Sequence, residues 1–240
     1  MFYETRKSKQ NTYGQVYFPV TKTIEMNFRK LIAEFIGTFF LTLTVCMTSY
    51  SKVSADLQPL AVGVALIGLI YAGGYISGSI FNPAVTLAVL LRGRLNIKEA
   101  GAYMTAQFLG GIAAALVTIV LTSAKPIVFP IESPPQYFGV IPAVLAEILG
   151  AFALVWVVLN VATSKSIDGN NFYGLSIGLT LMGLIYTFGS VSGSVFNPAV
   201  AVASNITQLS QLANIWIYLV GGFGGAAMAA FAYKYINPEE

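Results

Sequence analysis

Apolar residues form long continuous runs along this chain and do not alternate with polar ones. Six runs approach the roughly 20 residues that a transmembrane helix needs; they are residues 31–49, 57–76, 99–122, 139–162, 173–190 and 213–234. Two further runs, 82–91 and 197–207, are about half that length and too short to cross a bilayer. Because the strands of a membrane barrel would alternate, the pattern predicts an all-α membrane protein.

The composition supports a membrane protein and excludes several other classes. Of the 240 residues, 56% are hydrophobic and only 10% are charged, whereas soluble domains carry about 25% charged residues. Soluble, disordered and nucleic-acid-binding classes are therefore excluded. There is no histidine and a single cysteine, Cys46, so a zinc site or a Cys–His nucleophile cannot be built. We expect no metal, no cofactor, no nucleic-acid partner and no enzymatic activity.

The basic residues indicate the orientation in the membrane. With a cytoplasmic N-terminus, eleven basic residues fall on the inner side and only Lys52 and Lys125 on the outer side, as positive residues favour the cytoplasm. We expect a multi-pass protein of the plasma membrane, embedded in the lipid bilayer, with both termini cytoplasmic and no cleaved signal peptide. Residues 1–30 would form a cytoplasmic segment and residues 31–240 a single membrane domain.

The two halves of the chain, about 31–123 and 137–236, resemble each other. The block 77–85 recurs at 192–200 and the block 63–71 at 178–186, both at an offset of 115 residues, and Glu34 recurs as Glu147 at an offset of 113. Each half holds three long runs, so the second half must be inverted relative to the first. Inverted repeats place the functional site near the midplane, where interrupted segments of the two halves meet.

Each half-length run begins with Ser-Gly-Ser-x-Phe-Asn-Pro-Ala-Val. Asparagine followed by proline is typical of a helix start, and the preceding Ser-Gly-Ser suits an extended, tightly turning approach. We therefore expect two loops that enter the membrane and return as half-helices whose N-terminal ends meet at its centre. The alternative is that each Asn-Pro merely begins an ordinary helix after a turn.

This arrangement predicts a narrow polar track for small neutral solutes. The Asn82 and Asn197 amides would donate hydrogen bonds to a passing oxygen, and the positive helix ends would repel cations. The backbone carbonyls before each half-helix would accept hydrogen bonds; they belong to Gly78, Ser79, Ile80, Gly193, Ser194 and Val195.

The motifs resemble those of the aquaporin, or major intrinsic protein, family over residues 28–236. They include two Asn-Pro-Ala boxes, Asn82-Pro83-Ala84 and Asn197-Pro198-Ala199, and the segments 33–38, 106–110 and 216–221. The resemblance implies a right-handed bundle of six transmembrane helices with two re-entrant half-helices. It also implies a water channel and a homotetramer in which each subunit has its own pore.

Glu34 and Glu147 are the only acids well inside the predicted spans, and an intramembrane acid is a functional candidate by default. One reading is a proton relay. The other is that each carboxylate accepts backbone N–H groups from a re-entrant loop. The repeat symmetry favours the second reading and the resemblance implies it, with Gln107 as a further loop-supporting residue.

The resemblance also implies a four-residue selectivity filter at the outer end of the pore, formed here by Val62, Ile185, Ser194 and Val200. Family members usually carry arginine at the position of Val200. We expect this apolar filter to be wider, so that glycerol, urea, ammonia or peroxide pass as well as water. In the alternative, Phe188 or the proline-rich loop 124–136 narrows the mouth and leaves a strictly water-selective channel.

Other membrane functions stay open at this point. Inverted repeats also build secondary transporters, and a structural membrane protein with a closed pore is a third hypothesis. A passive channel is favoured because few acids are present in the spans to couple transport to an ion. The repeat-related Tyr71 and Tyr186 are expected either to face the pore or to anchor the helices at the interface.

Overall fold

The fold is a bundle of α-helices. The computed structural model describes residues 27–50, 55–123 and 139–240, and these ranges contain eight α-helices, three short 3₁₀ turns and no strand. The long helices are α1 (Phe28–Tyr50), α2 (Gln58–Ser77), α4 (Ile97–Thr122), α5 (Val140–Thr163), α6 (Tyr173–Ser192) and α8 (Ile215–Ile236), and the short ones are α3 (Pro83–Leu91) and α7 (Pro198–Ile206).

The six long helices are long and apolar enough to cross a membrane. The prediction of an all-α, multi-pass membrane protein is therefore confirmed, and each expected span agrees with a helix to within about three residues. The segment 1–26 and the loop 124–136 lie outside the described residues.

The helix ends follow from local sequence. Asn82 and Asn197 cap the short helices, and a proline follows each of them at the first helical position. α2 and α6 end where the next residue, Gly78 or Gly193, adopts a left-handed conformation with φ of 92° and 89°. Glycine adopts this conformation without the steric cost that a side chain brings.

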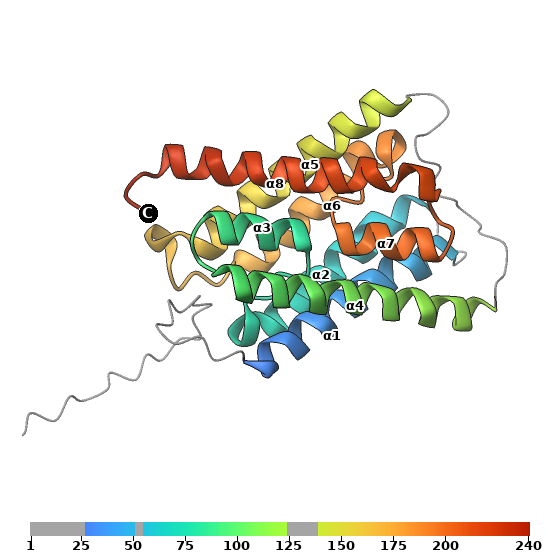
Figure 1. Ribbon diagram of the computed structural model, residues 1–240, viewed down its shortest axis with the longest axis horizontal. Helices are drawn as coiled ribbons and strands as arrows, with labels where there is room; N and C mark the ends of the chain where they lie inside the picture. Colours follow the sequence, from blue (N-terminus) through green and yellow to red (C-terminus); the bar gives the residue numbers. More distant parts are fainter. Residues whose placement is uncertain (1–26, 51–54, 124–138) are drawn as a thin grey trace, which may run out of the picture.

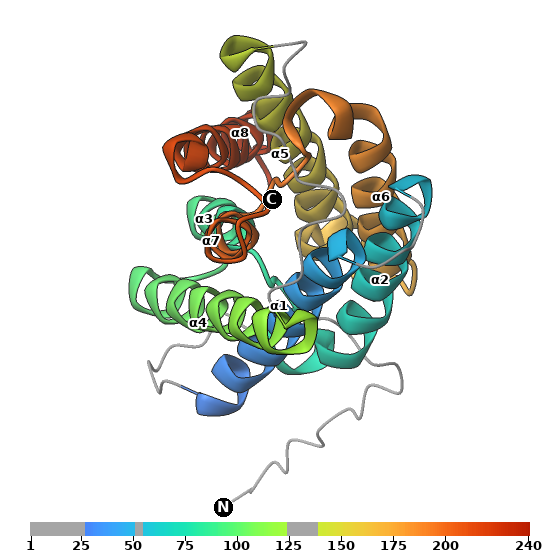
Figure 2. The same cartoon turned by 90° about the vertical axis from the view of Figure 1, so that its right-hand side faces the viewer.

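The helices pack as the repeat predicts. α1 lies against α4, and the repeat-related α5 lies against α8, while α2 and α6 contact each other. Figures 1 and 2 show α3 and α7 end to end, filling the space between α4 and α8. The two half-helices together thus take the place of one long helix in the wall of the bundle.

The contact between α2 and α6 depends on two repeat-related glycines. A Cβ atom on Gly63 would lie 2.9 Å from the Gly178 carbonyl oxygen, and one on Gly178 would lie 2.7 Å from the Gly63 oxygen. Small residues let helix backbones approach this closely in membranes. The two halves of the repeat therefore meet here.

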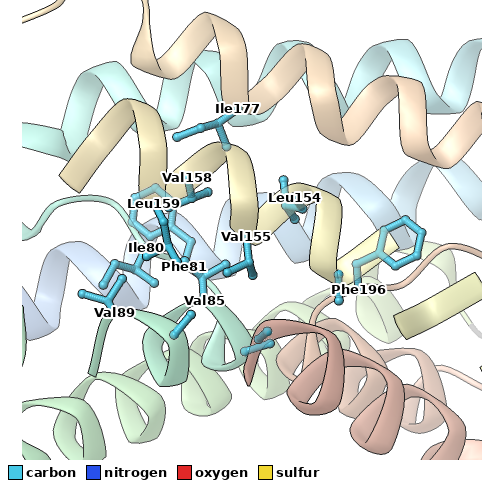
Figure 3. Close-up of a cluster of buried hydrophobic side chains, with 14 of the residues drawn as sticks. Ile80, Phe81, Val85, Val89, Leu154, Val155, Val158, Leu159, Ile177 and Phe196 are labelled. Carbon is cyan, nitrogen blue, oxygen red and sulfur yellow. The ribbon is translucent and has the colours of Figure 1, made fainter. Parts of the chain in front are cut away.

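The main apolar core joins the first re-entrant loop to α5. Figure 3 shows Phe81 and Val85 among Val155, Val158 and Leu159 of α5. All five side chains are buried. Because the loop is packed into this core, its backbone is held in place by the rest of the bundle.

Candidate channel and its two re-entrant loops

Two five-residue loops, 78–82 and 193–197, connect α2 to α3 and α6 to α7. The expectation of an extended approach is wrong for most of their length. Positive φ values occur at Gly78, Ser79 and Phe81 and at the repeat-related Gly193, Ser194 and Phe196, whereas the two capping asparagines, Asn82 and Asn197, have extended backbone. A non-glycine residue in this region costs of order 1–3 kcal/mol and persists only where its surroundings enforce it.

Glu34 of α1 supplies that support for the first loop. One carboxylate oxygen accepts hydrogen bonds from the Ser77 hydroxyl (2.6 Å) and the Ile80 N–H (3.0 Å). The other accepts from the Phe81 N–H (2.7 Å) and the Gln107 amide (2.8 Å). The side chain is completely buried and has lost its contacts with water. The four donors compensate for that loss, because a buried charge is costly unless it is hydrogen-bonded.

Glu147 of α5 holds the second loop in the same way. It accepts from the Ser192 hydroxyl (2.7 Å), the Val195 N–H (3.0 Å) and the Phe196 N–H (2.8 Å). The glutamine is missing from this half, because Gly222 stands 115 residues after Gln107. The two loops thus share one design, but the first has an additional side-chain donor.

Each loop also places a phenylalanine ring against a glycine. A Cβ atom on Gly37 would lie 2.0 Å from the Phe81 ring, and one on Gly150 would lie 2.1 Å from the Phe196 ring. Both rings are about 1% exposed. The glycine of the Glu-x-x-Gly pattern in each half therefore leaves space for the phenylalanine ring. The ring packs next to the glutamate that accepts a hydrogen bond from the backbone N–H of the same phenylalanine.

The two loops are joined by their asparagines. Asn82 Nδ2 donates to the Phe196 carbonyl and Asn197 Nδ2 donates to the Phe81 carbonyl, both at 3.0 Å. Each asparagine Oδ1 accepts the N–H two residues later, at 2.8 and 3.0 Å. One amide hydrogen of each asparagine is therefore used within the protein, which the sequence did not indicate, and the second is left for the interior of the bundle.

A cavity of about 630 Å³ runs through the bundle. It follows α6 from Tyr173 to Ser190, a length of roughly 26 Å at the rise of an α-helix, which is close to the roughly 30 Å thickness of the hydrocarbon layer. The cavity therefore has the dimensions of a channel. Other residues that line it are Leu41, Val45, Gln58, Leu66, Ile70, Asn82, Val85, Leu154, Val158, Ile177, Leu181 and Asn197.

The residues expected at the filter and along the loops lie on this channel. They are Val62, Ile185, Ser194 and Val200, together with Gly78, Ser79, Ile80, Gly193 and Val195. Glu34 and Glu147 are not among the lining residues. Phe188 is not either; its ring packs edge-on against Phe196 at 6.3 Å. Among the described lining residues, Asp56 carries the one charge and none is basic.

The hydroxyl groups of Tyr71 in α2 and Tyr186 in α6 each form hydrogen bonds to the backbone at the start of the other helix. The Tyr71 hydroxyl donates to the Asn171 carbonyl (2.9 Å) and accepts from the Leu175 N–H (3.1 Å), just before and inside α6. Its repeat partner, Tyr186, donates to the Asp56 carbonyl (2.6 Å) just before α2. Tyr186 also lines the channel, whereas Tyr71 does not.

Comparison with known proteins agrees with this architecture. The profile of the family described as "Major intrinsic protein" matches residues 21–233. A probable aquaporin NIP-type from Nicotiana alata is 30% identical over 96% of this chain and 86% of its own length. The chain belongs to the major intrinsic protein family. It is accordingly an integral, multi-pass membrane channel and not an enzyme.

Other members of the major intrinsic protein family are similar over most of their length. Aquaporin NIP1-1 from Zea mays is 34% identical over 87% of this chain and 75% of its own length. The glycerol uptake facilitator protein-like 6 of Lactiplantibacillus plantarum is 34% identical, covering 88% of this chain and all of the relative. The X-ray structure of the aquaglyceroporin from Plasmodium falciparum has the same fold, with a TM-score of 0.75, 24% identity, and coverage of 88% of this chain and 97% of that one.

Proposed function

We propose that this chain is a passive channel for water and small neutral solutes. The similar proteins include aquaporins and a glycerol uptake facilitator, and the cavity along α6 provides a path of nearly membrane thickness. Flux follows the concentration gradient. The alternative of a secondary transporter is not favoured, because Glu34 and Glu147 are held by loop donors and do not line the path.

The observation that carries the choice of solutes is the set of side chains at the outer end of the channel. Val62, Ile185 and Val200 present only hydrocarbon there, and Ser194 is the one hydroxyl of the four. Valine occupies less volume than an extended arginine and brings no charge. The filter is therefore wide and apolar enough for glycerol, urea, ammonia or peroxide in addition to water.

The centre of the channel supplies the polar contacts. Asn82 and Asn197 each keep one amide hydrogen that is not used by the protein backbone. The backbone carbonyls of residues 78–80 and 193–195 accept hydrogen bonds from a passing solute. The N-terminal ends of α3 and α7 bring partial positive charge to the same place, which disfavours cations and protons.

The cellular setting follows from charge distribution and family membership. The excess of basic residues on one side supports cytoplasmic termini, and the plasma membrane is the membrane we assign. A homotetramer of four independent pores is the assembly that the family resemblance supports.

Stopped-flow light scattering on proteoliposomes tests this function. Sucrose, glycerol and urea gradients are applied separately to vesicles with the purified protein and to empty vesicles. Fast shrinkage in sucrose, followed by re-swelling in glycerol or urea, is the expected result. Shrinkage without solute re-swelling would favour a strictly water-selective channel, and no flux above empty vesicles would favour a structural role.

A further inference from the structure

The outer mouth of the channel contains a polar side chain that the filter residues do not account for. Gln58 is the first residue of α2 and lines the channel. Val62, on the same face of α2, is four residues deeper, which is about 6 Å along the helix. Gln58 therefore meets a solute from the outside one helical turn before the apolar filter does.

The orientation of the Gln58 amide is determined by its neighbours on α1. Its Nε2 lies 2.8 Å from the Ser49 hydroxyl and 3.4 Å from the Val45 carbonyl. A carbonyl can only accept. The single Ser49 hydroxyl hydrogen is donated to the same Val45 carbonyl at 3.0 Å, so the Ser49 oxygen must accept from Gln58. Both neighbours can thus only accept from Gln58, so the amide nitrogen must face them. The Oε1 atom is then free to face the channel.

Tyr186 points to the same chemistry as Gln58, and Asp56 and Ser190 are the other described polar residues that line this mouth. Tyr186 lines the mouth, but its hydroxyl hydrogen is donated to the Asp56 carbonyl at 2.6 Å. The two amide hydrogens of Gln58 are directed at α1. What these two side chains offer a solute is therefore oxygen lone pairs and no hydrogens.

We propose that the Gln58 Oε1 atom is a specificity-determining group that accepts a hydrogen bond from entering solutes and favours those rich in N–H and O–H donors, with Ser49 as its positioning residue. This inference rests on the proposed function, because it requires that solutes larger than water pass the filter. Urea, with four N–H hydrogens, gains more at this mouth than a molecule of similar size in which one NH₂ group is replaced by a methyl group.

Urea and acetamide form that matched pair, and their permeabilities are measured in proteoliposomes after subtraction of the flux through empty vesicles. We expect the wild-type protein to favour urea over acetamide. In Gln58→Met, which keeps the length of the side chain but removes the amide, the urea-to-acetamide ratio should fall about three- to tenfold, the worth of one hydrogen bond. Ser49→Ala, which frees the amide to rotate, should lower the ratio in the same direction. Leu60→Met, on the exposed side of the same turn of α2, is the control and should leave it unchanged.

The outcomes separate this inference from the proposed function. Passage of both solutes with the same ratio in wild type and Gln58→Met would overturn the role of Gln58 and leave the mixed-solute channel intact. A merely structural role would lower water, urea and acetamide fluxes together without changing the ratio, which would also overturn it. Water flux without either solute would contradict the proposed function and the role of Gln58 together.

Discussion

The Asn82 side-chain amide donates a hydrogen bond to the backbone carbonyl of Phe196, 114 residues later and in the other half of the chain, at 3.0 Å. In the repeat-related half, the Asn197 amide donates the equivalent hydrogen bond to the Phe81 carbonyl. Each asparagine thus caps its own half-helix and holds the opposite loop. The two half-helices are aligned by this pair of bonds, and any change to one asparagine should affect both loops.

Asn82→Ala tests that coupling. The variant loses the cap on α3, which is worth about 0.5–2 kcal/mol, and leaves the buried Phe196 carbonyl without its donor, at a cost of about 1–3 kcal/mol. We expect a lower thermal midpoint in detergent and a lower water permeability. Asn82→Ala and Asn197→Ala should be less than additive in combination, because each bond supports the same junction; strict additivity would contradict the coupling.

Glu34→Gln tests the support of the first loop. The amide replaces one carboxylate oxygen by an NH₂ group that cannot accept, so the two hydrogen bonds to that oxygen are lost, each worth about 1.5–3 kcal/mol when the acceptor is charged. We expect lower stability and reduced flux. Gln107→Met removes a single donor, keeps both loop N–H bonds to Glu34, and should have the smaller effect on both measurements. Unchanged stability with altered proton current in Glu34→Gln would instead support a proton relay.

Gly37→Ala tests whether the Phe81 ring positions the loop. The added methyl group would lie 2.0 Å from the ring, and overpacking of this kind costs typically about 1–3 kcal/mol. Gly101→Ala is the matched control in α4, where nothing lies within 4 Å, and alanine in a helix should stabilise by up to about 1 kcal/mol. Thermal unfolding of both variants should give shifts of opposite sign. Equal shifts would show that the ring can move aside.

Much of the fold could be predicted from apolar runs and the repeat. Long runs report spans because the bilayer demands length, and Asn-Pro marks each half-helix because capping is local. The left-handed backbone at Ser79 and Phe81 could not be predicted. Glu34 enforces this backbone conformation from a position 43 or more residues away in the sequence. The local sequence does not indicate it. The Asn82–Phe196 bond and the amide orientation of Gln58 are likewise set by distant partners.

Glu240 offers a pH-dependent contribution to stability outside the spans. Desolvation raises the pKa of its carboxyl group, but hydrogen bonds from Lys165 N–H and from Ser164 and Ser166 outweigh it and lower the pKa from 4.5 to about 2. Arg92 also pairs with it at 3.2 Å. Because the folded pKa is depressed, this contribution is complete above the unfolded pKa of 4.5 and is lost as the pH falls towards 2.

Glu240→Gln should therefore lower the thermal midpoint at pH 7. The difference from the wild type should stay constant down to about pH 5 and shrink between pH 4.5 and 2. Glu239→Gln is the control, because Glu239 is exposed and has no hydrogen bond or ion pair among the described residues. A difference that does not change with pH would mean that the Glu240 carboxylate charge contributes nothing.

The most direct test of the mixed-solute channel is the ratio of glycerol to water permeability in proteoliposomes of wild type and Val200→Arg. Val200 lines the channel and is 4% exposed, so an arginine there would fill the mouth and add a positive charge. A wild-type protein that conducts both, with glycerol flux reduced at least about tenfold relative to water in Val200→Arg, is the predicted result. An unchanged ratio would contradict the account, because something other than Val62, Ile185, Ser194 and Val200 would then select the solute.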